Sequence, residues 1–448
     1  MTVDKVAPER RTGAPERPTP ADHRAGDAGA ATRPSAFDEN RISKAAFIVA
    51  ASAGLGYMFD AYVVNMYSFV LPLIKDDFGV SATTLGAIGS ILLTGYMIGT
   101  FLFGWIADKW GRKPTLNLSI VTYALTNAAS GLAPGVFSFA ALRFITGIGG
   151  AGEIAVGVPY TAEVYPTRKR AYGCGGLIFS LYAVGTLIGL SVALAFAESV
   201  GWRVTFYLSL IPAALVLLFR RALTESERFQ RARAEHDARD DGDSGFAKDQ
   251  VGVILRTPEL RRRLTIGSMI FIANAVGYWG FLVFLQTYML GQFDLAFRTS
   301  LAVSMIFFGA MLVWPWIGAH AAERLGRRPA GVIGGIGIAI GSIIAFSTQS
   351  LGVFIVAAVF GIGMLGYTWS VGLTYVAELF PTAMRGTGFG LSVAIGRFPA
   401  IFGPLVSGAL ISSLGLGTIA RIFAVLWLLY IAGFILGPET RGRSLEEI

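Results

Sequence analysis

Twelve stretches of roughly 20 or more mostly apolar residues run through this chain of 448 residues, and they restrict its fold more than any other feature. A helix needs about 20 such residues to cross the hydrocarbon core of a bilayer. Inside the bilayer every backbone polar group has to be bonded within the protein, so each stretch is expected to be a transmembrane helix. The stretches are residues 45–74, 83–107, 114–132, 136–159, 172–197, 203–221, 264–290, 297–320, 329–348, 352–376, 388–413 and 418–437.

The composition agrees with a polytopic membrane protein. Hydrophobic residues make up 54% of the chain and charged residues only 15%, and the mean hydropathy is +0.59. A soluble fold would have to place much of this apolar content on a wet surface. The single cysteine, Cys174, excludes an internal disulfide, and three widely separated histidines give no basis for a metal site.

Two segments lack long apolar runs. Residues 1–42 are rich in Ala, Pro and Arg, and we expect a disordered cytoplasmic tail without the apolar core of a signal peptide. Residues 222–263 form the one long polar connection and divide the stretches six and six. The expected organisation is therefore a six-helix bundle over 43–221, a cytoplasmic central loop over 222–263, a second bundle over 264–437 and a polar tail over 438–448.

Lysine and arginine are distributed unevenly between the connections. If the N-terminus is cytoplasmic, the cytoplasmic segments contain 31 of these residues and the opposite side contains four. Excess positive charge marks cytoplasmic loops. We therefore expect a multi-pass protein of the inner (cytoplasmic) membrane with both termini in the cytoplasm. Topology and contact with anionic lipids also account for the net charge of +8, so no nucleic-acid partner is expected.

The chain contains an internal repeat. AEVYPTRKRAYG at 162–173 matches AELFPTAMRGTG at 377–388 at six of twelve positions. DKWGRKP at 108–114 matches ERLGRRP at 323–329 with the same offset of 215 residues. Two matches at one offset indicate a duplicated six-helix unit. Parallel repeats of this kind place substrate sites near the midplane, between the halves.

One loop motif carries a resemblance to a known family. The pattern G-x-x-x-D-K/R-x-G-R-K/R is matched by Gly104, Asp108, Lys109, Gly111, Arg112 and Lys113, and PETRGRSLEEI at 438–448 resembles the ending of sugar porters. Over residues 45–440 the chain resembles a transporter of the major facilitator superfamily. The resemblance implies an all-α membrane protein with twelve transmembrane helices in two pseudo-symmetric six-helix bundles.

The resemblance also implies a gate. In this family, charged clusters at the cytoplasmic ends of the second and fourth helices of each half latch the two halves together. The alternative is that these charges only fix topology. The matching positions here are Asp108, Arg112, Lys113, Glu163, Arg170, Glu323, Arg327, Glu378 and Arg385.

Four ionisable residues lie inside the apolar stretches, namely Asp60, Arg143, Glu153 and Arg397. Such residues are costly in a bilayer and mark functional sites. Asp60 and Arg143 resemble the paired Asp and Arg of proton-coupled sugar porters, which makes these two, with Glu153, the candidates for proton coupling. The alternatives are a permanent Asp60–Arg143 ion pair, and a Glu153 that only bonds to a neighbouring helix.

The fourth stretch indicates a subgroup. GIGGAGE at 147–153 and FDAY at 59–62 resemble the phosphate, nicotinate and other organic-acid transporters, although Val63 replaces a second acid and weakens a phosphate interpretation. Arg397 is then the candidate anion receptor, because a guanidinium bonds a carboxylate in a bidentate manner. Polar and aromatic side chains complete the candidate substrate site, which comprises Arg397, Tyr57, Asn274, Tyr278, Trp279 and Trp369.

The expected function is proton-coupled symport of a small organic anion carrying a carboxylate. A sugar/proton symporter and a drug or metabolite efflux antiporter are the alternatives within transport. A receptor is disfavoured because the central loop is too short for a signalling domain. An enzyme is not expected, because the spans lack a nucleophile–base pair. We expect a monomer without a metal or cofactor, with the proton as coupling ion.

Overall fold

The computed structural model describes residues 1, 41–197, 199–239, 250–414, 418 and 425–445. Some side chains within helices, including those of 279–288 and 403–414, are also outside the description. Two compact units are present, Met1–Glu39 and Asn40–Ile448, and only the second is considered from here on. Most of the tail expected to be disordered, 1–42, lies outside the described residues.

A helix coincides with each of the twelve apolar stretches. In the first half these are α1 (Lys44–Phe69), α3 (Ala82–Trp110), α4 (Arg112–Ser130), α5 (Val136–Val164), η2 with α6 (Tyr172–Leu177 and Ile178–Phe196), and α7 with α8 (Trp202–Tyr207 and Leu210–Arg220). In the second half they are α11 (Pro258–Gln292), α12 (Phe297–Leu325), α13 (Arg327–Ala345), α14 (Leu351–Glu378), α15 (Arg385–Leu414) and α17 (Trp427–Leu436). Among the described residues, eight helices are long and apolar enough to cross a membrane. The prediction of an all-α membrane fold is confirmed.

Three helix boundaries differ from the expected ones. The first stretch does not continue to residue 74, because α1 ends at Phe69 and a short helix α2 (Leu71–Phe78) begins with a proline in its first turn. The sixth stretch is split into α7 and α8. The central polar segment is not only loop, since it contains α9 (Glu227–Arg239) and α10 (Gln250–Arg256).

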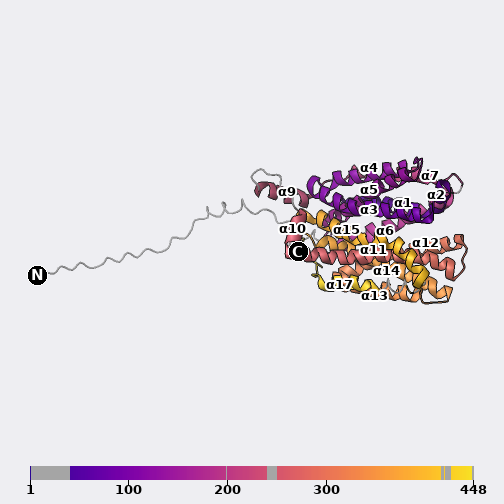
Figure 1. Ribbon diagram of the computed structural model, residues 1–448. Helices are drawn as coiled ribbons and strands as arrows, with labels where there is room; N and C mark the ends of the chain where they lie inside the picture. Colours follow the sequence, from indigo (N-terminus) through magenta and orange to yellow (C-terminus); the bar gives the residue numbers. More distant parts are fainter. Residues whose placement is uncertain (2–40, 198, 240–249, 415–417, 419–424, 446–448) are drawn as a thin grey trace. The chain divides into compact units, whose positions relative to one another are not determined.

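The two halves form bundles that lie against each other (Figure 1). Two helix pairs make the interface, α3 with α15 and α6 with α12. These are the second and eleventh stretches and the fifth and eighth, which are equivalent pairs under the repeat. Within the bundles, α3 packs on α5, and α12 packs on α14. The interface therefore has the pseudo-symmetry that the sequence repeat predicts.

Glycines allow these helices to touch backbone to backbone. A Cβ added at Gly95 of α3 would lie 2.1 Å from the carbonyl oxygen of Phe144 in α5. Between the bundles, a Cβ at Gly104 would lie 2.3 Å from the carbonyl oxygen of Gly386, and one at Gly390 would lie 2.3 Å from that of Thr100. Association inside lipid depends on such close packing, because lipid tails are as apolar as the helices.

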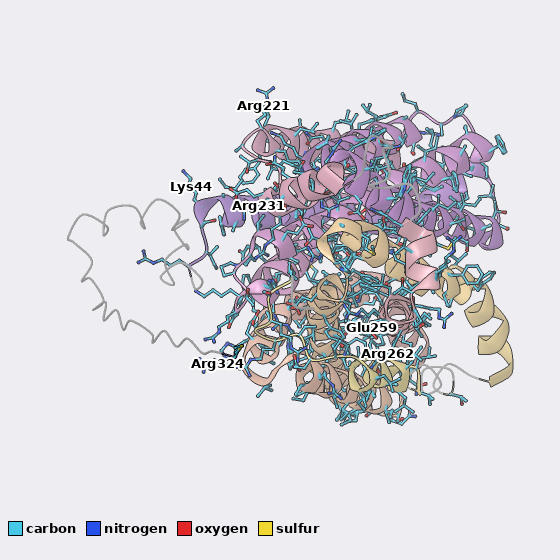
Figure 2. All side chains as sticks on the ribbon, turned by 90° about the vertical axis from the view of Figure 1, so that its left-hand side faces the viewer. Lys44, Arg221, Arg231, Glu259, Arg262 and Arg324 are labelled. Carbon is cyan, nitrogen blue, oxygen red and sulfur yellow. The ribbon has the colours of Figure 1, made fainter. Side chains whose placement is uncertain are left out.

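One end of the bundles is strongly charged. The helices α9 and α10 lie at this end, whereas α2 and α7 lie at the other (Figure 1). Figure 2 looks onto it and shows that charged side chains from both halves reach its surface; those labelled are Lys44, Arg221, Arg231, Glu259, Arg262 and Arg324. We call this the charged end.

The glycine contacts predict a difference between two substitutions in α3. Gly95→Ala should lower the melting temperature of the detergent-purified protein by at least about 3 °C, because the helices must move apart. Gly86→Ala is the control, since a Cβ there meets nothing within 4 Å and alanine favours helix. Equal melting temperatures for the two variants would show that the α3–α5 packing is looser than described.

Candidate functional site

A cavity lies between the two bundles, with about 520 Å³ of space not filled by atoms, including the part open to solvent. Its charged lining residues are Asp60 from α1 and Arg397 from α15, so each bundle contributes one charge. The full lining consists of Tyr57, Asp60, Val64, Leu92, Leu93, Tyr96, Phe179, Tyr182, Ala275, Tyr278, Trp369 and Arg397.

The carboxylate of Asp60 is buried and only half bonded. Its Oδ2 accepts a hydrogen bond from the hydroxyl of Tyr96 in α3. Its Oδ1 has no hydrogen-bond partner among the described residues. The approach depends on Gly150 of α5, where an added Cβ would lie 2.5 Å from Oδ1. This oxygen is therefore available to a proton or a ligand.

The guanidinium of Arg397 lies over the ring of the same tyrosine. Its Cζ is 4.0 Å from the ring centroid of Tyr96, which is a cation–π contact. Its Nε is buried without a hydrogen-bond partner in the described part of the chain. Asp60 and Arg397 thus share the cavity without a direct ion pair between them. The unbonded Nε can donate to an anion.

Aromatic rings form one wall of the cavity and cross the bundle interface. Trp369 of α14 stacks on Phe179 of α6, with centroids 5.5 Å apart and an interplanar angle of 9°. Tyr278 meets Trp369 edge-on at 6.5 Å. Nε1 of Trp369 is buried and has no partner among the described residues. A flat ligand can contact these rings while a polar group of the ligand accepts from Nε1.

The expected substrate residues fall into three groups. Arg397, Tyr57, Tyr278 and Trp369 all line the cavity. Asn274 does not, because it is fully buried next to Gly372 of α14, where both of its amide atoms lack partners in the described structure. The side chain of Trp279 lies outside the described residues.

Arg143 is not the partner of Asp60, which corrects the expected pair. Its guanidinium is buried inside the first bundle and donates to Asn127 at 2.6 Å and to Ser130 at 2.9 Å. It also lies 5.0 Å from the ring centroid of Phe206. Neutral acceptors and an aromatic face therefore hold this charge, and it takes no part in the cavity.

Glu153 has a partner that the sequence analysis missed. Arg220, counted there as part of the central loop, is the last residue of α8 and is buried in an ion pair with Glu153. Ser119 donates to the same carboxylate at 3.3 Å, and Arg220 donates to the carbonyl of Leu116 at 2.7 Å. A fully bonded pair of this kind holds α4, α5 and α8 together and leaves Glu153 poorly suited to carry a proton.

Asp108 joins the two bundles at the charged end. Its buried carboxylate accepts from the backbone N–H groups of Gly386 at 3.1 Å and Thr387 at 2.6 Å, and from the Thr387 hydroxyl at 2.8 Å. These residues lie in the first turn of α15, whose N–H groups have no partners within the helix. The carboxylate therefore caps a helix of the opposite bundle at its positive end.

A buried ion network continues from this contact. Asp108 pairs with Arg112 at 2.5 Å, and Arg112 pairs with Glu163 at 2.8 Å. Glu163 also lies 3.3 Å from Arg385 of the second bundle. The network connects α3, α4 and α5 with the start of α15.

The second copy of the motif makes the equivalent contact. Glu323 accepts from the backbone N–H of Ala171, just before η2, at 2.7 Å. Ala171 and Gly386 are 215 residues apart, as are Asp108 and Glu323, so the repeat relates both acids and both helix starts. We call the two contacts, with their ion pairs, the latch.

The remaining gate candidates complete the latch, with one exception. Arg327 pairs with Glu378 at 2.9 Å, and Arg170 of the first half lies 3.7 Å from the same Glu378. Lys113 differs from expectation, because its Nζ donates to the carbonyl of Leu223 at 2.6 Å, within its own bundle.

Several functional residues had no signal in the sequence analysis. Tyr96 bridges the two charges of the cavity, and Arg220 completes the Glu153 pair. Glu225 caps α4 by accepting from the first two N–H groups of that helix at 2.9 and 3.1 Å. Glu439 does the same for α13, at 2.9 and 3.0 Å. The repeat could have identified these two caps, since TES at 224–226 and PET at 438–440 occupy equivalent places.

The latch predicts a measurable opening of the charged end. Spin labels at Arg221→Cys and Arg324→Cys, both exposed and on different bundles, report the separation by electron–electron distance measurement. Adding Asp108→Asn should populate a second, longer distance, because an amide nitrogen replaces an acceptor and a charged hydrogen bond is lost. The buried Cys174 can stay in place.

The matched control is Asp77→Asn, which removes the partly exposed ion pair with Arg203, 2.8 Å long, at the opposite end. It should leave the distances unchanged. If Asp108→Asn also leaves them unchanged, Asp108 does not hold the bundles together.

Comparison with known proteins agrees with this geometry. The family model of the Major Facilitator Superfamily matches residues 53–321 and 299–447. A putative niacin/nicotinamide transporter NiaP of Bacillus subtilis is 29% identical over 402 residues, covering 88% of this chain and 96% of that protein. A cis,cis-muconate transport protein of Acinetobacter baylyi is 29% identical, covering 82% and 88%.

Solved structures show the same fold. The proton:xylose symporter XylE, bound to 6-bromo-6-deoxy-D-glucose, aligns with a TM-score of 0.77 and 22% sequence identity, covering 91% of this chain and 99% of that one. The family model spans nearly all the described helices, and the repeat, the latch and the central cavity occur together within them. The chain belongs to the Major Facilitator Superfamily and is a multi-pass membrane transporter, not an enzyme.

Proposed function

We propose that this transporter is a proton-coupled symporter of a small organic anion that carries a carboxylate. The observation that carries the proposal is the unpaired arrangement of Asp60 and Arg397, which face one cavity from opposite bundles. A permanent ion pair would leave a neutral cavity with no polar atom to spare. Here each charged group keeps one buried atom without a partner.

The charges of the cavity link the proton to the substrate. With Asp60 ionised, its charge and that of Arg397 balance, and an anion gains little by entering. With Asp60 protonated, Arg397 leaves one net positive charge, which a carboxylate neutralises. Each ligand therefore raises the affinity for the other, and this reciprocity is what symport requires.

The named relatives support a carboxylate. Niacin and cis,cis-muconate, the compounds in two relatives' names, are both carboxylates, and the aromatic wall suits a flat molecule. The likeness to the xylose symporter concerns the fold alone. No resident cofactor is proposed, with the proton as coupling ion, and a monomer is proposed because one chain contains the whole cavity and the latch.

The direction of access follows from the latch. We place the charged end, with both termini, in the cytoplasm, since the basic residues gather there. The described state is then closed toward the cytoplasm by the latch. Transport by alternating access requires the latch to break and an opposite closure to form.

The orientation is tested by reporter fusions. Cytoplasm-dependent fluorescent proteins placed after residue 448 and within 225–250 should both be active, because 31 of the basic residues lie on that side. An alkaline phosphatase, which requires the periplasm, should be inactive at the same positions. Active phosphatase at both positions would reverse the topology.

The substrate proposal is tested by uptake into proteoliposomes. Labelled nicotinate and benzoate should accumulate when a proton gradient is imposed, whereas nicotinamide, the neutral counterpart of nicotinate, should neither accumulate nor compete. Asp60→Asn should abolish accumulation but allow exchange. Arg397→Lys should lower uptake about tenfold or more, because lysine keeps the charge but loses the planar fork.

The control for the lysine variant is Arg203→Lys, a similar change at a partly exposed arginine outside the cavity. It should transport like the wild type. Competition by neutral sugars but by no monocarboxylate would overturn the organic-anion proposal in favour of a sugar. Gradient-driven accumulation in Asp60→Asn would remove this residue from proton coupling.

A further inference from the structure

Tyr96 is a single residue that touches both charged groups of the cavity. Its side chain is buried, with 2% of the residue exposed, and it lies on α3 between α1 and α15. Its hydroxyl donates to Asp60 Oδ2, and its ring faces the guanidinium of Arg397 at 4.0 Å. Gly150 makes room for both contacts, because a Cβ there would meet the Tyr96 ring at 3.4 Å and Asp60 at 2.5 Å.

This arrangement keeps two opposite charges apart. In a medium of low dielectric constant, a carboxylate and a guanidinium within reach attract each other strongly. A direct pair would occupy the donors of Arg397 that an anionic substrate needs. The tyrosine instead offers each group a weaker neutral partner, a hydroxyl for the carboxylate and a π face for the guanidinium.

Other groups around Asp60 cannot take over this role. Charged groups that act on it are Arg397 from α15 and Glu153 from α5. Glu153 is already bound to Arg220. Of the nearby tyrosines, Tyr123 of α4 donates to the carbonyl of Gly56 at 3.2 Å. Among the described residues, the hydroxyl of Tyr96 is the hydrogen-bond donor that Asp60 has.

We propose that Tyr96 is the positioning residue that couples proton binding to substrate binding, holding Asp60 through its hydroxyl and Arg397 through its ring. This rests on the proposed function of proton symport. A proton arriving from water adds to the free Oδ1 of Asp60, while the tyrosine continues to donate to Oδ2. The substrate carboxylate then accepts from Arg397, and release of the proton to water on the other side restores the starting state.

The two contacts can be removed separately. Tyr96→Phe keeps the ring under Arg397 and removes only the donor to Asp60. The ionised carboxylate is then less stabilised, so nicotinate binding should persist to higher pH, with its midpoint moved by about one unit. Affinity at low pH should stay as in the wild type, and proton-driven accumulation should fall about tenfold.

Tyr96→Leu removes both contacts. Arg397 can then close onto Asp60, so nicotinate affinity should fall about tenfold or more even at low pH. The control is Tyr67→Phe, which removes another buried hydroxyl, one that donates to the carbonyl of Leu85 at 2.7 Å. It should match the wild type in affinity, pH midpoint and accumulation.

Binding is measured on the purified full-length protein by calorimetry across a pH series, with nicotinate and nicotinamide as probes. An unchanged pH midpoint in Tyr96→Phe, while the wild type shows pH-dependent nicotinate binding, overturns the role of Tyr96. Wild-type protein that binds nicotinate equally at every pH, or binds nicotinamide as well, instead overturns the proposed function.

Discussion

A buried carboxylate that caps a helix of the opposite bundle is the contact on which the arrangement of the two halves depends. Asp108 accepts three hydrogen bonds from the start of α15, and Glu323 repeats the contact on the other side of the interface. Lipid supplies no hydrophobic force between helices, so polar contacts and close glycine packing have to hold the bundles. Because burying charges is costly, such a network can also be exchanged for another state at a small net change in free energy.

The same physical rule separates the functional charges from the structural ones. Glu153 and Arg220 satisfy each other and their neighbours, and Arg143 is satisfied by neutral acceptors. Asp60 and Arg397 are the exception, since each retains a buried polar atom without a partner in the described structure. An unsatisfied buried group costs free energy in the empty state. A proton and an anionic substrate recover that free energy on binding, which gives the cavity its selectivity.

The sequence predicted the parts of the molecule that depend on pattern. The apolar stretches, the repeat and most of the latch were identified because their signals are local or recur after 215 residues. Side-chain partners inside the bundles were not predictable in this way, because they depend on how each helix is rotated. Arg143 therefore received the wrong partner, and Arg220 was counted as loop. Tyr96 is one of 15 tyrosines and carries no motif, so only the three-dimensional packing distinguishes it.

The most direct test of the central claim is the proton taken up when substrate binds. Purified wild-type protein in weakly buffered detergent solution, with a pH-sensitive dye, should take up close to one proton per nicotinate bound at a pH where Asp60 is ionised in the empty cavity. Asp60→Asn should bind nicotinate without this uptake. Binding of nicotinate by the wild type with no proton uptake at any pH, or with the same uptake in Asp60→Asn, would contradict coupling through Asp60.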